Sequence, residues 1–205
     1  MADLVSNEVG HLDEESKKRY REKLNLVGTT DPYLLQRSML KSPEHFATAD
    51  LPDLSYPDIY NYLVDSPSPY TGKDLKAYKS LDAYKYFTAG FMHDGLIWQI
   101  PNKNRFLLMT KVKHSQRMND PPLRPWVAIA KDGQILCCHC TCMAGLGETC
   151  SHSAASLFAL ETLIRMKTAT SCTSLPCDSP VKLLKYADDT TLIGLIQDGD
   201  ETAYR

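Results

Sequence analysis

The amino-acid sequence predicts an α+β protein with a helical N-terminal half, a small antiparallel sheet, and a final β-hairpin followed by a helix. Three observations lead to this fold class. Helix formers and helical spacing of apolar residues dominate up to about residue 95. Runs of β-branched and aromatic residues begin at Leu96, and an apolar helical pattern returns after Cys150.

Short helices separated by polar, proline-containing segments are expected in the N-terminal half. Charged helix formers predict an exposed helix from Asp13 to Leu24, and a second short helix is expected from Tyr33 to Leu40. Pro57 suits the first turn of a helical element that continues to Val64, because a proline there loses no hydrogen bond.

A longer helix is expected from Lys73 to Phe91, with Thr71 as its N-cap. Within it Tyr84, Phe87 and Phe91 recur at helical spacing and therefore share one face. Aromatic residues in such a stripe normally pack in a core, so we expect this face to be buried rather than to bind a ligand.

Four strands are expected next, and the last two should form a hairpin. Asp132-Gly133 lies between them and predicts a type I′ turn, which requires positive φ at both central residues. The final strand leads directly into Cys140, and a helix from Ser153 to Met166 should follow. The expected strands are Leu96–Ile100, Arg105–Val112, Trp126–Ala130 and Gln134–His139.

A compact set of metal-binding residue types lies between these last two elements. Cys140 and Cys142 form a CxC pair, Cys150 and His152 form a CxH pair, and seven residues separate the pairs. Three sulfurs and one nitrogen can fill the tetrahedral coordination of one Zn²⁺ and leave no position for water. The sequence therefore predicts one structural zinc ion that clamps the hairpin to the following helix.

The neighbouring cysteines leave an alternative open. Cys138 and Cys140 also form a CxC pair, so Cys138 could replace Cys142 as a ligand. We prefer Cys142 because Cys137 and Cys138 continue the strand pattern, where a thiol serves as a small apolar filler. The other alternative is that the clustered cysteines are free thiols that bind no metal. Beyond the helix, we expect Cys172 and Cys177 to be free thiols.

The four predicted ligands carry a resemblance to a known family. Cys140-Thr-Cys142 and Cys150-Ser-His152, with a hairpin before and an apolar helix after, resemble the SWIM-type zinc finger. The match is close over residues 105–166 and looser over 13–166, where it is similar to SWIM-containing animal proteins. This resemblance implies zinc binding, with DNA binding or protein–protein contact as its use, and implies no catalytic role.

Charge along the chain bears on a nucleic-acid partner. The net charge is −2, so no global positive field attracts nucleic acid. One segment is nevertheless basic, with Asp120 as its only acid, and its cations are Lys103, Arg105, Lys111, Lys113, Arg117, Arg124 and Lys131. Arg105, Lys111 and Lys113 are spaced so that one strand face could meet phosphates, but we favour the simpler interpretation that they lie on the solvated face of a half-buried sheet.

The C-terminal segment carries a second resemblance. Tyr186-Ala-Asp188-Asp189, flanked by apolar runs, resembles the YxDD hairpin of the palm in retroelement reverse transcriptases. That family uses the aspartates to hold two metal ions, but the earlier palm strand that completes the site has no counterpart here. An inactive fragment of an RNA-directed DNA polymerase is therefore the alternative function, and we expect no enzyme activity.

These observations divide the chain into expected regions: 1–95 helical, 96–168 hairpin, zinc site and helix, 169–180 linker, and 181–205 polymerase-like. The sequence shows no signal peptide and no membrane-spanning run, so we expect an intracellular protein, with the nucleus as one candidate compartment. The expected partner is protein or nucleic acid, with no membrane and no small-molecule substrate.

Overall fold

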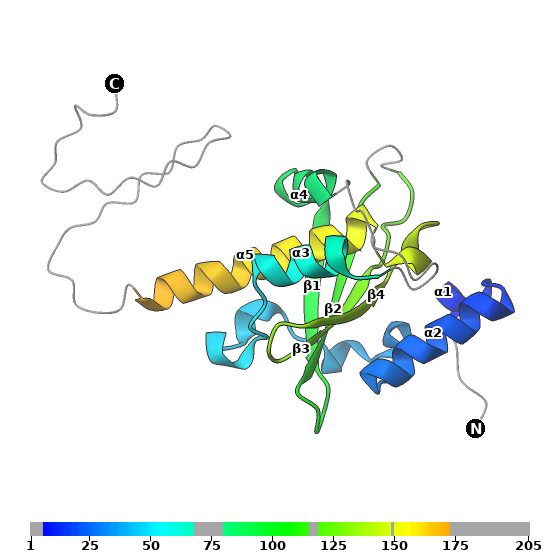
Figure 1. Ribbon diagram of the computed structural model, residues 1–205, viewed down its shortest axis with the longest axis horizontal. Coiled ribbons are helices and arrows are strands. Elements are labelled where there is room, and N and C mark those ends of the chain that lie inside the picture. The colour runs from blue at the N-terminus through cyan, green and yellow to red at the C-terminus, as the bar shows by residue number, and fades with distance from the viewer. Residues whose placement is uncertain (1–5, 68–79, 115–118, 149, 173–205) are drawn as a thin grey trace, which may run out of the picture. The chain divides into compact units, whose positions relative to one another are not determined.

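The computed structural model describes residues 6–67, 80–114, 119–148 and 150–172 (Figure 1). The chain divides into two compact units, Met1–Lys167 and Thr168–Arg205, and only the last residues of helix α5 are described in the second. The helices are α1 (Asn7–Gly10), α2 (Glu14–Val27), α3 (Tyr56–Tyr60), α4 (Ser80–Thr88) and α5 (Ser151–Cys172). The strands are β1 (Met92–Gln99), β2 (Arg105–Val112), β3 (Trp126–Ala130) and β4 (Ile135–His139).

Short helical turns complete the described elements. The π-helical turn η5 (Asn61–Asp65) continues α3, and the 3₁₀ turn η6 (Gly145–Gly147) lies between β4 and α5. Four more 3₁₀ turns connect α2 to α3: η1 (Pro32–Leu34), η2 (Arg37–Met39), η3 (Pro43–His45) and η4 (Thr48–Asp50). The single helix expected from Tyr33 to Leu40 is therefore wrong, because two separate turns occupy that stretch.

The strands form one antiparallel sheet in the order β1-β2-β3-β4. Phe106 of β2 pairs with Ile129 of β3, and Val127 of β3 pairs with Cys138 of β4. Helices together with a small antiparallel sheet confirm the predicted α+β class. None of the described helices is long and apolar enough to cross a membrane.

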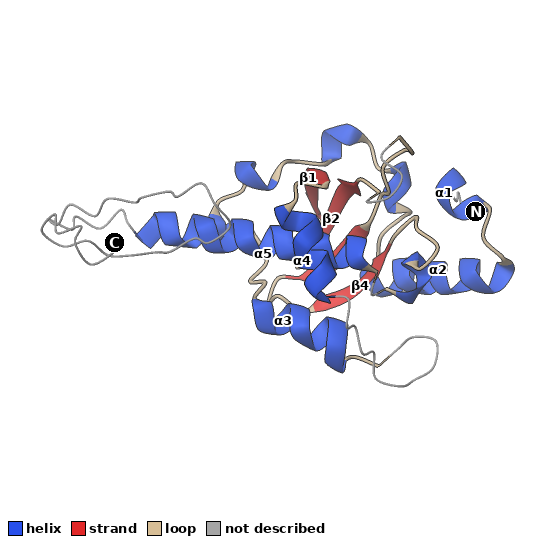
Figure 2. Cartoon of the chain, turned by 90° about the horizontal axis from the view of Figure 1, so that it is seen from above, coloured by secondary structure: helices blue, strands red, loops and turns tan. Residues whose placement is uncertain are grey.

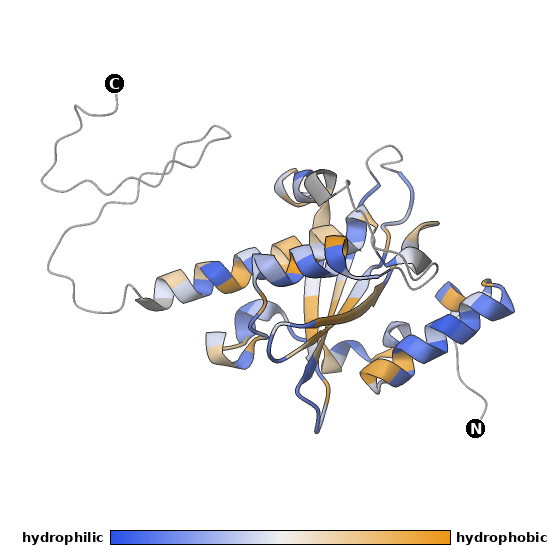
Figure 3. Ribbon diagram, viewed as in Figure 1, coloured by the Kyte–Doolittle hydropathy of each residue, from blue (hydrophilic) through white to orange (hydrophobic). Residues whose placement is uncertain are grey.

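One face of the sheet packs against α3, η5, α4 and α5 (Figures 1 and 2). Phe106 and Leu108 point to this side from β2, and Leu157 meets them from α5. The apolar residues of α5 recur at helical spacing, which places Ala154, Leu157, Phe158 and Ile164 on the buried face. Figure 3 shows apolar colouring along the strands and on parts of α5.

The opposite face packs against the N-terminal elements. Leu107 and Met109 alternate with the residues of the first face, as the two-residue period of a strand requires. They share a core cluster with Tyr20 and Val27 of α2 and with Trp126 of β3. Although both faces of the sheet are covered, the solvated face suggested for these cations forms in part, because Arg105 is half-buried whereas Lys111 and Lys113 are exposed.

Helix α2 has a capping residue at each end. The Asp13 carboxylate accepts a hydrogen bond from the Ser16 backbone amide at 2.9 Å. Gly28 ends the helix with φ near 70°, a conformation that favours glycine. The helix thus runs one turn beyond its predicted end at Leu24.

The hairpin between β3 and β4 forms as predicted, but its turn type differs. Gly133 has φ near 91°, whereas Asp132 is not among the described residues with positive φ. The Gly133 amide donates to the Ala130 carbonyl, and the Ala130 amide donates to the Gln134 carbonyl. This is a three-residue loop with a left-handed glycine rather than a type I′ turn, so one extra residue fits between the strands.

The aromatic stripe near α4 is only partly buried. Tyr84 remains 48% exposed, although its ring packs edge-on against Phe158 at 5.7 Å. Phe91 lies beyond the end of α4 at Thr88. The expected buried face therefore forms only in part, because Phe87 packs against the core cluster whereas Tyr84 stays half-exposed. Residues 73–79 of the predicted helix lie outside the described residues.

Candidate metal centre

The first predicted ligand pair follows directly after strand β4. Its last residue is His139, so Cys140 leaves the sheet at its end and the chain turns at Thr141. The Thr141 hydroxyl accepts a hydrogen bond from the Arg124 amide at 3.0 Å. This bond fixes the residue between Cys140 and Cys142, so the CxC turn is held from the segment that precedes β3.

The loop after Cys142 folds back tightly on the strand end. The Gly145 amide donates to the Cys142 carbonyl at 2.9 Å. A Cβ built on Gly145 would lie 2.6 Å from the carbonyl carbon of Cys140 and closer still to its oxygen. Glycine is therefore required here by close backbone approach, whereas Gly147 has open space around it.

The second ligand pair begins helix α5. The Cys150 carbonyl accepts the first helical hydrogen bond, from Ala154, at 3.1 Å. The Cys150 sulfur accepts from the Ser153 backbone amide at 3.4 Å, as a capping side chain does. An N-terminal helix end favours negative charge, so this position suits a thiolate, and His152 follows in the same first turn.

The structure brings all four predicted ligands together. The ligand atoms of Cys140, Cys142, Cys150 and His152 all lie within 4.8 Å of one another. Cys140 and Cys150 are buried, and Cys142 and His152 are half-buried. The cluster could hold one metal ion, although the identity of that ion is not shown.

The three thiols lie so close that their ionisation is shared. Hydrogen bonds from Cys140 and Cys142 hold the pKa of Cys150 well below its usual range. Hydrogen bonds to Cys142 and Cys150, together with burial, raise the pKa of Cys140. Cys150 thus ionises easily, whereas Cys140 resists ionisation. A divalent cation would offset the repulsion between neighbouring thiolates by stabilising all of them at once.

The histidine supports the same interpretation. The Nδ1 atom of His152 is buried, and it has no hydrogen-bond partner among the described residues. A buried nitrogen without a partner is costly, and a bound cation would satisfy it. The Tyr86 ring packs edge-on against the imidazole at 5.5 Å and restricts its orientation.

The two neighbouring cysteines lie in the sheet. Cys137 belongs to one core cluster and Cys138 to the other, as successive strand residues on opposite faces. Both thiols are buried, and burial raises their pKa. This placement agrees with their assignment as strand residues; the choice of Cys142 over Cys138 as a ligand stays a prediction.

Sequence reasoning missed the residues that support the loop. Glu148 is buried within the loop and pairs with Lys23 of α2 at 2.8 Å. One signal in the sequence pointed to Lys23, because it shares the helical spacing of the buried residues Tyr20 and Val27. No comparable local signal marks Glu148.

Most of the predicted basic residues that the structure describes make contacts within the protein. Lys103 donates to the Gly28 carbonyl at 3.1 Å, and Arg105 donates to the Leu26 and Val27 carbonyls at the end of α2. Lys131 donates to the Leu51 carbonyl at 2.6 Å. These cations satisfy the carbonyl groups of helix and loop ends, which leaves them poorly placed to meet phosphates.

Two further cations are paired with carboxylates. Lys111 lies 2.9 Å from Asp94, and Arg124 pairs with Glu8 while stacking over the Tyr33 ring. Lys113 is exposed, and Arg117 lies outside the described residues.

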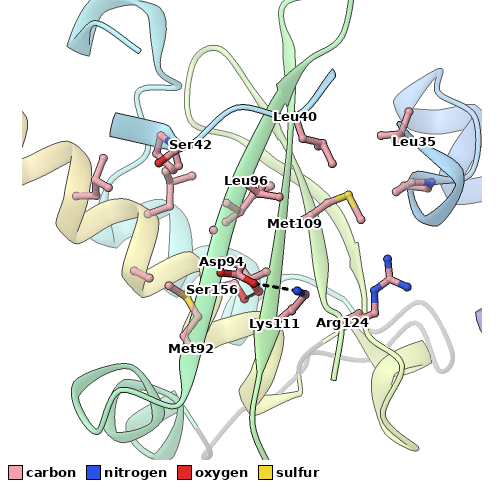
Figure 4. A pocket seen from close by; sticks show the side chains of 18 of the residues that line it. Leu35, Leu40, Ser42, Met92, Asp94, Leu96, Met109, Lys111, Arg124 and Ser156 are labelled. Atoms are coloured by element: carbon pink, nitrogen blue, oxygen red, sulfur yellow. Dashed lines mark hydrogen bonds and ion pairs between the residues drawn. The ribbon is translucent and has the colours of Figure 1, made fainter. Parts of the chain in front are cut away.

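A groove of about 710 Å³ runs along the β1 edge of the sheet (Figure 4). The register of β1 shifts between His93 and Leu96, and the Asp94–Lys111 ion pair lies at this irregularity. At the base of the groove the hydroxyl groups of Thr110 and Ser156 share a hydrogen bond of 2.6 Å. This contact ties the first turns of α5 to β2 and so helps to place His152.

No protein-family model, curated protein or solved structure shows significant similarity to the chain. The candidate metal site is therefore supported by the arrangement of its four residues. The polymerase-like segment, with Asp188 and Asp189, lies outside the described residues, as do 173–180 of the predicted linker.

Proposed function

We propose that the chain is a zinc-binding module of the SWIM type. One structural Zn²⁺, held by Cys140, Cys142, Cys150 and His152, clamps the β3–β4 hairpin to α5. The observation that carries this proposal is the approach of four donor atoms to within 4.8 Å of one another, at the junction of strand and helix. Zinc is favoured over harder divalent cations because three thiolates and an imidazole are soft or borderline ligands.

The role proposed for the metal is structural. Four protein ligands complete a tetrahedron and leave no open position for water or substrate. We therefore propose no enzyme activity for the metal centre. Its contribution would be to clamp the loop between β4 and α5.

The function proposed for the module is interaction with a macromolecular partner, protein or nucleic acid. The use of Lys103, Arg105 and Lys131 to bind internal carbonyl groups favours a protein partner. A phosphate-binding surface needs several cations that are free to face the solvent.

Metal analysis tests the first part of the proposal. The purified protein should contain one zinc per chain, and Cys142→Ala and Cys150→Ala should each lose it. Residues 134–158 should then unfold, since metal binding and local folding are coupled. Cys138→Ala keeps all four proposed ligands and should still contain one zinc per chain; loss of zinc from Cys138→Ala and its retention in Cys142→Ala would overturn the ligand assignment.

A salt titration tests the preference for protein. Binding to a DNA duplex should be weak and should change little between low and moderate salt. Tight binding that falls steeply with salt would instead show that several phosphates are neutralised, and the preference would then be wrong.

A further inference from the structure

A buried ion pair connects the metal-binding loop to the N-terminal helix α2. The Lys23 ammonium lies 2.8 Å from a Glu148 carboxylate oxygen, and their side chains are only 9% and 11% exposed. The two residues are far apart in sequence, and Glu148 precedes the ligand Cys150 by two positions. A buried charge is costly without its partner, so each residue constrains where the other can lie.

Glu148 is held at both its side chain and its main chain. Its second carboxylate oxygen accepts a hydrogen bond from the Tyr62 hydroxyl at 2.6 Å. Its carbonyl accepts from the Cys138 thiol at 2.6 Å. Its backbone has φ near 66°, a left-handed conformation that a glutamate seldom adopts. These contacts hold the loop in a conformation that its own sequence does not favour.

Lys23 closes the same network from α2. Besides pairing with Glu148, its ammonium donates to the Cys138 carbonyl at 3.0 Å. The outer edge of β4, the strand that leads to Cys140, is therefore bonded to α2 at the position beside the metal-binding loop. One lysine thus contacts both chain segments that carry the cysteine ligands.

We propose that Glu148 is a positioning residue for the metal centre and that Lys23, through Glu148, couples metal binding to the docking of α2 on β4. The proposal rests on the proposed function, because it requires that the four-ligand cluster binds a metal. Glu148 is not one of the four proposed ligands. It acts by fixing the backbone conformation that leads into Cys150. Residues that orient metal ligands in this way typically change metal affinity by about 10- to 100-fold when replaced.

Coupling of this kind differs from simple stabilisation in what it predicts. If the Lys23–Glu148 pair formed equally with and without metal, its loss would destabilise the fold but leave the zinc dissociation constant unchanged. If the pair forms fully only when the loop has its metal-binding conformation, zinc affinity must fall. Linkage also requires the reverse effect, so that zinc strengthens the docking of α2.

The test measures zinc dissociation constants by competition with a chromophoric chelator for the full chain and its variants. Glu148→Gln and Lys23→Met should each bind zinc about 10- to 100-fold more weakly than the unmodified chain. The double variant should bind no more weakly than the worse single variant, because both substitutions remove one interaction. Absorption of the Co²⁺-loaded proteins, which reports coordination geometry rather than fold stability, should change in Glu148→Gln.

Glu14→Gln and Lys17→Met are the matched controls. These residues form an ion pair of 2.9 Å on the solvent side of α2, with the Glu14 side chain 80% exposed. Both control variants should bind zinc within about twofold of the unmodified chain, because exposed pairs contribute little. Should Glu148→Gln not fold, Tyr62→Phe removes one hydrogen bond to Glu148 and keeps the ion pair, and it should still weaken zinc binding.

Hydrogen exchange supplies the reciprocal measurement. Zinc should slow the exchange of α2 amides in the unmodified chain and should have a smaller effect in Lys23→Met. Zinc affinity within twofold of the unmodified chain for Glu148→Gln, or for Tyr62→Phe if the former does not fold, would overturn the inference. Absence of zinc binding by the unmodified chain would instead refute the proposed function, so the two failures are distinguishable.

Discussion

Substitution of Gly145 by alanine is the sharpest perturbation of the metal-binding loop. The added Cβ would lie 2.6 Å from the Cys140 carbonyl carbon, whereas ordinary contact begins at 3.4 Å. The obstacle is backbone, which cannot rotate away as a flexible side chain can. The loop must therefore move from Cys140 by about 1 Å, several times the tolerance of about 0.2 Å in metal–ligand distances.

The size of the effect follows from this clash. Added methyl groups in tightly packed positions cost about 1–3 kcal/mol. Gly145 approaches Cys140 only when the loop folds back between the two ligand pairs, so most of this cost should fall on metal binding. Since each 1.4 kcal/mol changes a dissociation constant about tenfold, Gly145→Ala should weaken zinc binding about 10- to 100-fold.

Gly147→Ala is the control, because nothing lies within 4 Å of a Cβ at that position. Zinc dissociation constants of both variants, measured by chelator competition, should separate them clearly. Equal affinities for Gly145→Ala and the unmodified chain would refute the reasoning, as would an equal loss in both variants. Thermal unfolding of the zinc-loaded proteins should rank them in the same order.

Three further outcomes are expected. Leu157→Ala, at a side chain with no exposed area, should lower the free energy of unfolding by about 2–5 kcal/mol in urea titrations; a smaller loss would contradict its central place in the core. The hydrogen bond and charge of Lys111 hold the pKa of Asp94 below 3.8, so the pair stabilises the fold above that pH and its contribution disappears as pH falls through the lower folded-state pKa. Lys111→Met should raise the Asp94 pKa toward 3.8 in a carboxyl NMR titration, and an unchanged value would rule out the pair. Lys131→Met should lose its bond to the Leu51 carbonyl and reduce thermal stability without changing DNA binding; the opposite pattern would revive a phosphate-binding role.

Elements with strong local signals were predicted well. Asp13 and the charged helix formers after it specify α2, and continuous apolar runs specify β2 and β3. These local patterns predict the elements correctly because capping and side-chain spacing depend on residues only a few positions apart. The α+β class followed from the same local patterns.

Elements that depend on distant contacts were predicted less well. The turn at Asp132-Gly133 was assigned from its dipeptide, but a Cβ at Gly133 would overlap the Asp53 backbone, a contact invisible in the local sequence. Tyr84 was expected in the core, and its exposure depends on how α4 lies against Phe158. Local periodicity identifies a face of a helix but does not say how much of that face another element covers.

The ligand set and its surroundings show the same division. By itself the sequence predicted the four candidate ligands Cys140, Cys142, Cys150 and His152, because all lie within thirteen residues, and the structure brings their ligand atoms within 4.8 Å of one another. Only the tertiary structure decided what supports the loop between them, since Lys23 meets Glu148 through folding of a chain that separates them widely. It also decided the use of the basic segment, whose cations bind carbonyl groups from other parts of the chain. Candidate ligands that lie close together in sequence can be recognised from their spacing, whereas the partner of a buried charge is set only when distant segments pack together.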